Sequence, residues 1–121
     1  MLSNNKKKGN YGETVAAGYL AEKGYVILER NYGGKGGEID IIALSPDKYT
    51  VFIEVKYRKN LANGYPREAV TIAKRRAVIR AAKRYIGEKN VTGDMRFDVL
   101  EIYGTTELVV NHLISAFSEW R

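Results

Sequence analysis

The sequence contains no cysteine and a single histidine, His112. Without cysteine there can be no disulfide and no thiolate metal site, and one histidine cannot build a histidine-rich zinc centre. No apolar run approaches the roughly 20 residues that a helix needs to span a bilayer. The first ten residues, MLSNNKKKGN, carry charge with no apolar stretch behind them, so they do not resemble a secretory signal. We therefore expect a cytoplasmic protein that does not associate with a membrane.

A chain of 121 residues is close to the usual size of one domain. Its apolar content of 45% and charged content of 28% are ordinary for a folded soluble protein. The three lysines at positions 6–8 lie in a polar segment with no apolar pattern. We therefore expect a flexible basic arm at residues 1–10 and a single folded domain at residues 11–121.

Positive charge is in excess and is concentrated in one segment. Twenty Lys and Arg against fourteen Asp and Glu give a net charge of +6, and the segment KRRAVIRAAKRYIGEK, residues 74–89, holds much of it. A localised basic surface suits a polyanion such as nucleic acid. A run of charge is also what the solvated face of an ordinary helix looks like, so charge leaves both interpretations open.

The pattern of apolar positions and turn residues predicts two helices and five strands. One helix is expected from Tyr11 to Gly24, and another from its N-cap, Thr71, to about Ile86. The strands are expected at residues 25–32, 38–44, 49–58, 95–103 and 107–117. The stripe that the second helix should bury consists of Ala73, Ala77, Val78, Ala81, Ala82 and Tyr85. The order α-β-β-β-α-β-β predicts an α/β fold in which helices flank a mixed β-sheet.

Charged residues occupy two of the most apolar predicted strands, which a short turn should join as an antiparallel hairpin. Glu38 and Asp40 share one face of the first strand, opposite Ile39 and Ile41, because side chains two positions apart point the same way. In the second strand the residues that share one face are Glu54, Lys56 and Arg58. If these faces coincide, three carboxylates converge, and a divalent cation with oxygen ligands would offset their repulsion. A Glu–Lys pair on a solvated sheet is the structural alternative.

The stretch GEIDIIA followed by VFIEVKYR resembles the PD-(D/E)xK nuclease superfamily, whose core is α-β-β-β-α-β and whose acids bind magnesium. Together with G…GE…A…YL…GY.IL.RNY, G.P.EAV…K…I…A..YI and RFDV, it more closely resembles the YraN-like family of small bacterial proteins, which are related to archaeal Holliday-junction resolvases. The resemblance extends from Tyr11 to about Ile102. It implies that residues 11–121 form a single nuclease-like domain with a restriction-endonuclease-like core.

The resemblance also implies roles for individual residues. Asp40, Glu54 and Lys56 match the catalytic residues, with Lys56 as the catalytic lysine. The implied metal ligands are Glu13, Asp40, Glu54 and the main-chain carbonyl of Val55. The superfamily's proline before the first acid is replaced here by Ile39, as is usual in the resolvase branch.

Further residues are expected to support the site or to hold substrate. We expect Glu38 to support the metal ligands without touching the ion. The candidates for contact with nucleic acid are Arg58, Lys74, Arg75 and Lys35. The alternative for Lys74 is a solvated lysine, and Lys35 lies in the loop GGKGG beside the expected site. Asp98, in RFDV, is expected to pair with Arg96 or a loop amide.

These features predict a Mg²⁺- or Mn²⁺-dependent endonuclease that hydrolyses phosphodiester bonds in DNA, either branched or single-stranded. Nearby carboxylates favour the charged form of Lys56, so we expect it to orient water and stabilise charge instead of abstracting a proton. The alternative is a non-catalytic accessory module of the same fold that binds DNA or RNA. The resemblance to resolvases is consistent with a homodimer, because two symmetric cuts need two sites.

Overall fold

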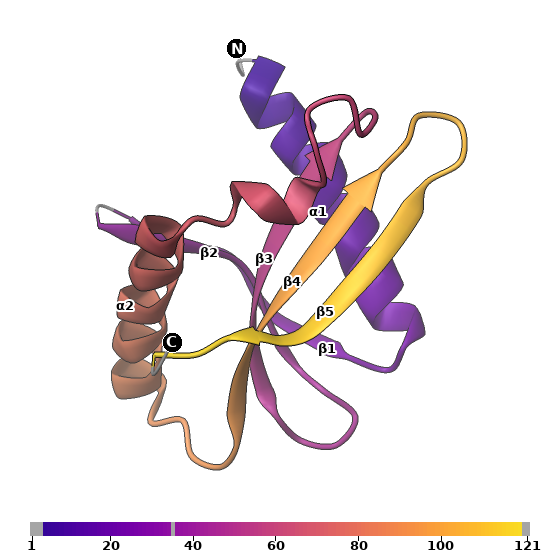
Figure 1. Cartoon of the computed structure of the whole chain (residues 1–121). Helices are drawn as coiled ribbons and strands as arrows, with labels where there is room; N and C mark the ends of the chain where they lie inside the picture. Colours follow the sequence, from indigo (N-terminus) through magenta and orange to yellow (C-terminus); the bar gives the residue numbers. More distant parts are fainter. Residues whose placement is uncertain (1–3, 35, 120–121) are drawn as a thin grey trace.

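The computed structural model describes residues 4–34 and 36–119, and Figure 1 shows the elements in chain order. The elements are α1 (Asn4–Glu22), β1 (Val26–Gly34), β2 (Gly37–Leu44), β3 (Thr50–Arg58), the 3-10 helix η1 (Pro66–Ala69), α2 (Ile72–Lys89), β4 (Met95–Tyr103) and β5 (Val109–Phe117). This is the predicted order, with η1 added. None of the helices in this part of the chain has the length and hydropathy that crossing a membrane requires.

The five strands form one mixed sheet in the order β1-β2-β3-β4-β5. Strand β2 pairs antiparallel with β1 on one side and with β3 on the other, and the predicted hairpin of β2 and β3 is confirmed. Strand β4 runs parallel to β3 after a crossover through η1 and α2, and β5 returns antiparallel to β4. The architecture is consistent with a restriction-endonuclease-like core.

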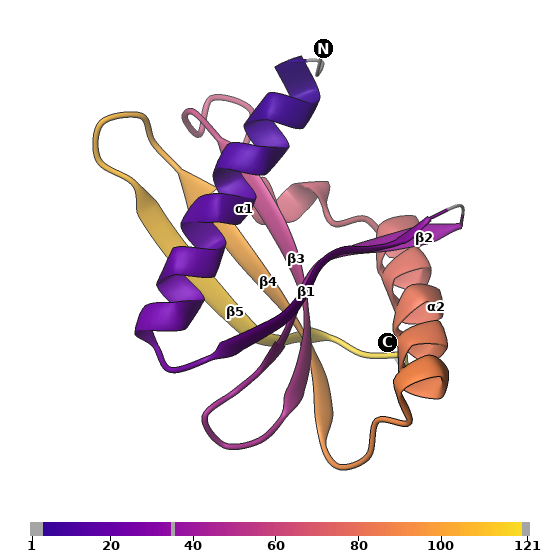
Figure 2. The same cartoon turned by 180° about the vertical axis from the view of Figure 1, so that it is seen from behind.

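Two apolar clusters lie on opposite faces of the sheet. On one face, Leu20 of α1 packs with Ile41 and Ile53, and Figure 2 shows α1 crossing this face. On the other face, Val78 of α2 packs with Phe52. Four of the six residues predicted for the buried stripe of α2 are buried: Val78, Ala81, Ala82 and Tyr85. Ala73 is exposed, because the first turn of α2 carries Lys74 and Arg75 toward the protein instead.

The predicted start of α2 is confirmed. Thr71 has extended backbone geometry and its hydroxyl accepts a hydrogen bond from the Lys74 N–H at 3.2 Å. This is the N-cap arrangement, which satisfies one of the free N–H groups of the first turn. The cap fixes the backbone position of Lys74, and the contact of the Lys74 side chain with Glu54 depends on that position.

The first helix begins earlier than predicted. Residues 4–10, assigned from the sequence to an arm, continue the backbone of α1 without a break. Residues 1–3 lie outside the described residues, as do the side chains of residues 4–10. A mobile arm, and with it the division of the chain at residue 10, therefore stays a prediction.

The alternation expected along β2 is wrong at Asp40. Ile39 and Ile42 pack on the α2 face, whereas Ile41 packs on the α1 face, so Ile39 and Ile41 do not share a side as predicted. The ladder between β2 and β3 covers only the pairs from Ile41↔Ile53 to Leu44↔Thr50. Beyond Ile41, toward Gly37, β2 leaves β3 and turns toward α2, as Figure 1 shows.

The departing end of β2 is held by α2. Arg80 and Arg84 donate hydrogen bonds to the carbonyls of Gly36 and Gly37, at 3.0 and 3.1 Å. Gly37 lies so close to the carbonyl of Ala77 that a Cβ there would overlap it. The departure of β2 from β3 therefore depends on backbone contact with α2, and it ends the β2–β3 pairing next to Asp40.

Candidate functional site

Asp40 lies at the point where β2 leaves β3. Its Oδ2 accepts a hydrogen bond from the Val55 N–H at 2.8 Å. The carboxylate thus replaces the backbone partner that β2 no longer provides to Val55. Because the N–H and C=O of one strand residue point toward the same neighbouring strand, the Val55 carbonyl is directed toward the same side as Asp40.

Glu54 projects from β3 on the α2 face and its side chain is 0% exposed. With both carboxylates ionised, neither Glu54 oxygen has a hydrogen-bond donor among the described residues. When the pair holds a proton, Asp40 and Glu54 share a side-chain hydrogen bond. Lys74 Nζ lies 3.5 Å from Glu54 Oε2 in an ion pair. A buried carboxylate without hydrogen bonds is costly, so it is the kind of group for which a functional explanation is sought.

Asp40 and Glu54 perturb each other. Burial raises the pKa of Glu54 to about 8, with a further contribution from the negative charge of Asp40. Burial also raises the pKa of Asp40, while the hydrogen bond from Val55 and the charges of Lys74 and Lys56 lower it. The two carboxyl groups therefore retain a proton at neutral pH, which a bound cation would displace.

Glu13 lies close to this pair but is not part of one assembled cluster. Its side chain is buried, its Oε1 lacks a hydrogen-bond partner in the described structure, and Arg30 Nη2 is 3.8 Å away. Burial raises the pKa of Glu13, and the charge of Asp40 raises it further. Glu38 is exposed, and its charge adds a smaller effect of the same sign.

The acids fit a divalent cation in part. Within residues 4–34 and 36–119, no group of three or more His, Asp or Glu side chains is already arranged to hold a metal ion. The unpartnered oxygens of Glu54 and the adjacent Asp40 carboxylate nevertheless form a hard-oxygen donor set, which suits Mg²⁺ or Mn²⁺. The roles predicted for Glu13 and the Val55 carbonyl as further ligands stay predictions.

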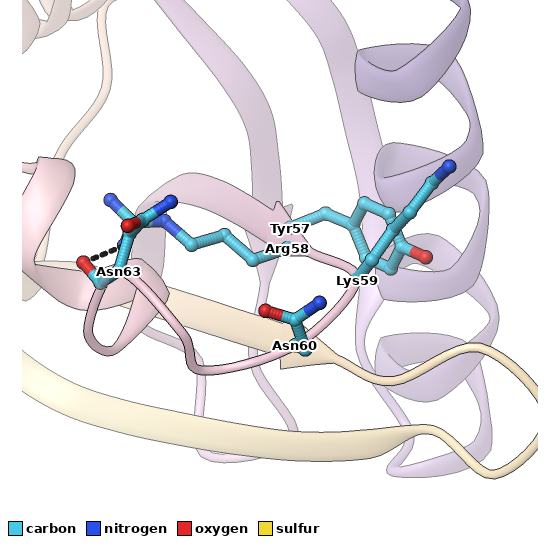
Figure 3. A pocket seen from close by; sticks show the side chains of 5 residues that line it. All are labelled: Tyr57, Arg58, Lys59, Asn60 and Asn63. Atoms are coloured by element: carbon cyan, nitrogen blue, oxygen red, sulfur yellow. Dashed lines mark hydrogen bonds between the residues drawn. The ribbon is translucent and has the colours of Figure 1, made fainter.

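Lys56 and Arg58 follow Glu54 along β3. Arg58 Nη1 donates to the main-chain carbonyls of Asn63 and Gly64, at 2.7 and 3.2 Å. Figure 3 shows Arg58 reaching toward Asn63 at the edge of an open pocket of about 400 Å³. The guanidinium of Arg58 therefore already supports the loop after β3, and its expected contact with phosphate stays a prediction.

The basic segment of α2 is largely occupied within the protein. Arg75 Nε donates to the Val70 carbonyl at 3.2 Å, and its guanidinium lies 5.8 Å from the centre of the Phe117 ring. Arg80 and Arg84 hold the β1–β2 hairpin. Arg76, Arg80, Lys83, Arg84 and Lys89 are nevertheless exposed, so both a solvated face and a phosphate-binding face stay open. The predicted nucleic-acid contact of Arg75 remains untested, and Lys35 lies outside the described residues.

Glu101 is a buried acid whose surroundings were not anticipated from the sequence. Arg67 donates to it from Nε at 3.0 Å, from Nη2 at 2.6 Å and from its main-chain N–H at 3.0 Å, and Asn111 Nδ2 donates at 2.9 Å. These bonds hold the pKa of Glu101 at about 2, with those from Arg67 the main cause. Glu101 is the register partner of Lys56 on the neighbouring strand. Because Arg67 is bonded to Glu101, it lies close to Lys56. Its only sequence signal is a charge within the apolar strand VLEIY.

Asp98 has the structural role expected of it. Its carboxylate accepts bonds from Arg96 Nε at 3.1 and 3.2 Å and from the Ser115 N–H at 2.9 Å. His112 Nε2 lies 2.7 Å from Asp98 Oδ2. These contacts join β4 to β5 on the face away from Glu54, so the RFDV motif supports the fold.

Comparison with known proteins places the chain in a family. Residues 12–102 match the family described as "Uncharacterised protein family UPF0102". A UPF0102 protein of Clostridioides difficile is 49% identical over 115 residues, covering 94% of this chain and 99% of that relative. UPF0102 proteins of Caldanaerobacter subterraneus subsp. tengcongensis and Clostridium perfringens are 43% and 42% identical, over 94% and 97% of this chain and 97% and 98% of theirs. The chain therefore belongs to the UPF0102, or YraN-like, family.

Proposed function

We propose that the protein is a metal-dependent endonuclease that hydrolyses phosphodiester bonds in DNA. The observation that carries this proposal is Glu54, which is fully buried beside a second carboxyl group, Asp40, and whose oxygens receive no hydrogen bond from an N–H or hydroxyl donor among the described residues. A hard divalent cation would supply the positive charge and the ligand contacts that the pair lacks.

In the proposed reaction Asp40 and Glu54 would hold the ion, and the hydrogen bond from the Val55 N–H keeps Asp40 in place. A bound Mg²⁺ or Mn²⁺ supplies Lewis-acid polarisation of the phosphate and a water of lowered pKa. Lys56 orients the attacking water and stabilises negative charge as it develops on the phosphate.

DNA is the substrate class that the charges favour. The chain has a net charge of +6, and the acid pair lies beside Lys56 and Lys74. Such a surface attracts a polyanion through its phosphates. The likeness to resolvases extends the proposal to branched DNA and to a homodimer with two sites, with single-stranded DNA as the alternative.

A second candidate is a non-catalytic module that binds DNA or RNA and assists another machine. One observation favours it: in the described part of the chain the acids do not form a group of three arranged for metal. Under this alternative, Asp40 and Glu54 would have no role in binding and would weaken it by repelling phosphate.

The two candidates differ in cleavage. We expect the wild-type protein to cut branched, flapped or single-stranded DNA only when Mg²⁺ or Mn²⁺ is present. Lys56→Ala should lose about 10²–10³-fold in rate, because a donor to the developing charge is removed. Lys89→Ala, at the exposed end of α2, is the matched control and should cut at the wild-type rate.

Equal rates for Lys56→Ala and the wild type would assign the cutting to a contaminant. Metal-independent binding of DNA, with no cutting of any of these substrates, would favour the accessory module.

A further inference from the structure

We propose that Lys74 is an internal counter-ion at the acid pair, which leaves Glu54 when a divalent cation binds and then contacts the phosphate of the substrate. This inference rests on the proposed function, because it concerns the same site. A lysine that only contacts phosphate would not affect metal binding. Lys74, in contrast, would compete with the metal ion for Glu54.

The position of Lys74 is set by the start of α2. Its main-chain N–H is bonded to the Thr71 cap, which fixes the Cα at the first turn. From there the side chain reaches Glu54 Oε2, at 3.5 Å from Nζ. Glu54 is 0% exposed, whereas the Lys74 side chain is 34% exposed. Lys74 therefore joins a buried carboxylate to the solvent side of the site.

Lys74 is distinguished from Lys56 by this contact. Lys56 lies two residues from Glu54 on the same strand, yet within the described residues it forms no ion pair with Glu54 at 4.0 Å or less. Lys74 comes from a separate element and forms that pair. Its long side chain belongs to α2 and is 34% exposed, so the ammonium group can move toward solvent without moving the sheet.

Lys74 and a metal ion would compete for Glu54. A cation bound to the Glu54 oxygens would lie within a few ångströms of the Lys74 ammonium, where two like charges repel strongly. Lys74 would then move outward, with a phosphate held at the ion as the nearest anion. Metal and DNA should therefore each strengthen the binding of the other, and the coupling is reciprocal.

Calorimetric titration of the purified full-length protein with Mn²⁺ tests the competition. Lys74→Gln should bind Mn²⁺ about tenfold more tightly than the wild type, because the competing charge is gone. Lys83→Gln removes a lysine from the same helix that pairs with Glu119 at 2.9 Å, and it should keep wild-type affinity. Lys74→Arg keeps the positive charge, so its affinity for Mn²⁺ should also stay close to that of the wild type.

If the wild type binds Mn²⁺ and Lys74→Gln binds it no more tightly, the counter-ion inference is overturned while the metal site stands. If the wild type does not bind Mn²⁺ at all, the proposed function falls and this inference with it. An equal gain in affinity for Lys74→Gln and Lys83→Gln would show a general charge effect and would also overturn the inference.

A second measurement tests the transfer to phosphate. Mn²⁺ should raise the affinity of the wild type for a short phosphorothioate DNA, which resists cleavage. In Lys74→Gln this gain should shrink severalfold, although the metal itself binds more tightly. The same gain in both proteins would contradict the proposed contact between Lys74 and phosphate.

Discussion

Glu54 and Glu101 lie on neighbouring strands, on the same face of the sheet, and both are fully buried. Glu101 receives four hydrogen bonds, from Arg67 and Asn111. Glu54 receives none from the described residues and has one ion pair, to Lys74. Because one acid is fully paired and the other is not, substitution of the two should have opposite effects on stability.

Glu54→Gln should stabilise the metal-free protein at neutral pH. The folded-state pKa of about 8 lies above the ordinary 4.5, so ionisation of Glu54 favours the unfolded chain as pH rises from about 4.5 to 8. At pH 7 we expect a gain of roughly 1–3 kcal/mol in the free energy of unfolding, measured with urea in the presence of a chelator. Below pH 4, where the carboxyl is protonated in both states, the gain should vanish. A variant less stable than the wild type at pH 7 would contradict this account.

Glu101→Gln should have the reverse effect. Its folded-state pKa of about 2 lies below 4.5, so its ionised form stabilises the fold above pH 4.5, and this contribution is lost as pH falls toward 2. We expect a loss of about 3 kcal/mol at pH 7 and about half of that at pH 3, from urea unfolding at both values. An equal loss at both pH values would mean that packing, and not charge, is responsible.

For single residues, the sequence identifies the candidate site residues better than it predicts which side chains pair with one another. Charges two positions apart in apolar strands identified Asp40, Glu54 and Lys56 as candidates. The pairing of Lys74 with Glu54 depends on how α2 is rotated against the sheet, which no local pattern specifies. The pairing of Glu101 with Arg67 joins residues 34 positions apart, so it could not be predicted either.

The elements themselves followed the sequence closely, except where tertiary contacts determine the backbone. Thr71 caps α2 as predicted, because an N-cap depends on neighbouring residues. The 3-10 helix η1 was missed, and it is stabilised by a long-range contact of Arg67 with Glu101. The break in alternation at Asp40 was also missed, since it results from the docking of β2 on α2.

Gly37→Ala tests that docking. A Cβ at position 37 would overlap the Ala77 carbonyl, so we expect a loss of about 3 kcal/mol in the free energy of unfolding. Gly87→Ala is the matched control, because a Cβ there would meet no described atom within 4 Å. In a helix, alanine is favoured over glycine by roughly 0.5–1 kcal/mol, so this variant should be more stable than the wild type. Similar losses for both variants would show that close contact at Gly37 does not hold β2 to α2.

Across the whole molecule, the number of basic residues overstates the surface free to bind a polyanion. Residues 74–89 hold seven Lys and Arg, but Arg75, Arg80 and Arg84 bond to the backbone of the protein itself. The sequence revealed the total charge and the family. The tertiary structure decides which basic side chains bond within the protein and which stay free on its surface. The homodimer is a proposal.

The salt dependence of DNA binding measures this division. If Lys56, Arg58 and Lys74 make the phosphate contacts, the logarithm of the association constant should fall with the logarithm of salt concentration with a slope of about −3. Fluorescence anisotropy with a short labelled duplex would measure it. A slope near −7 would mean that most of the basic segment of α2 binds phosphate, and a flat response would remove DNA as the partner.

The central claim is that Asp40 and Glu54 hold one divalent cation, and anomalous diffraction from crystals grown with Mn²⁺ tests it most directly. We expect a single strong anomalous peak in coordination contact with both carboxylates, absent from crystals of Asp40→Asn. Saturating Mn²⁺ with no peak at these two residues, or a peak that persists in Asp40→Asn, would contradict it.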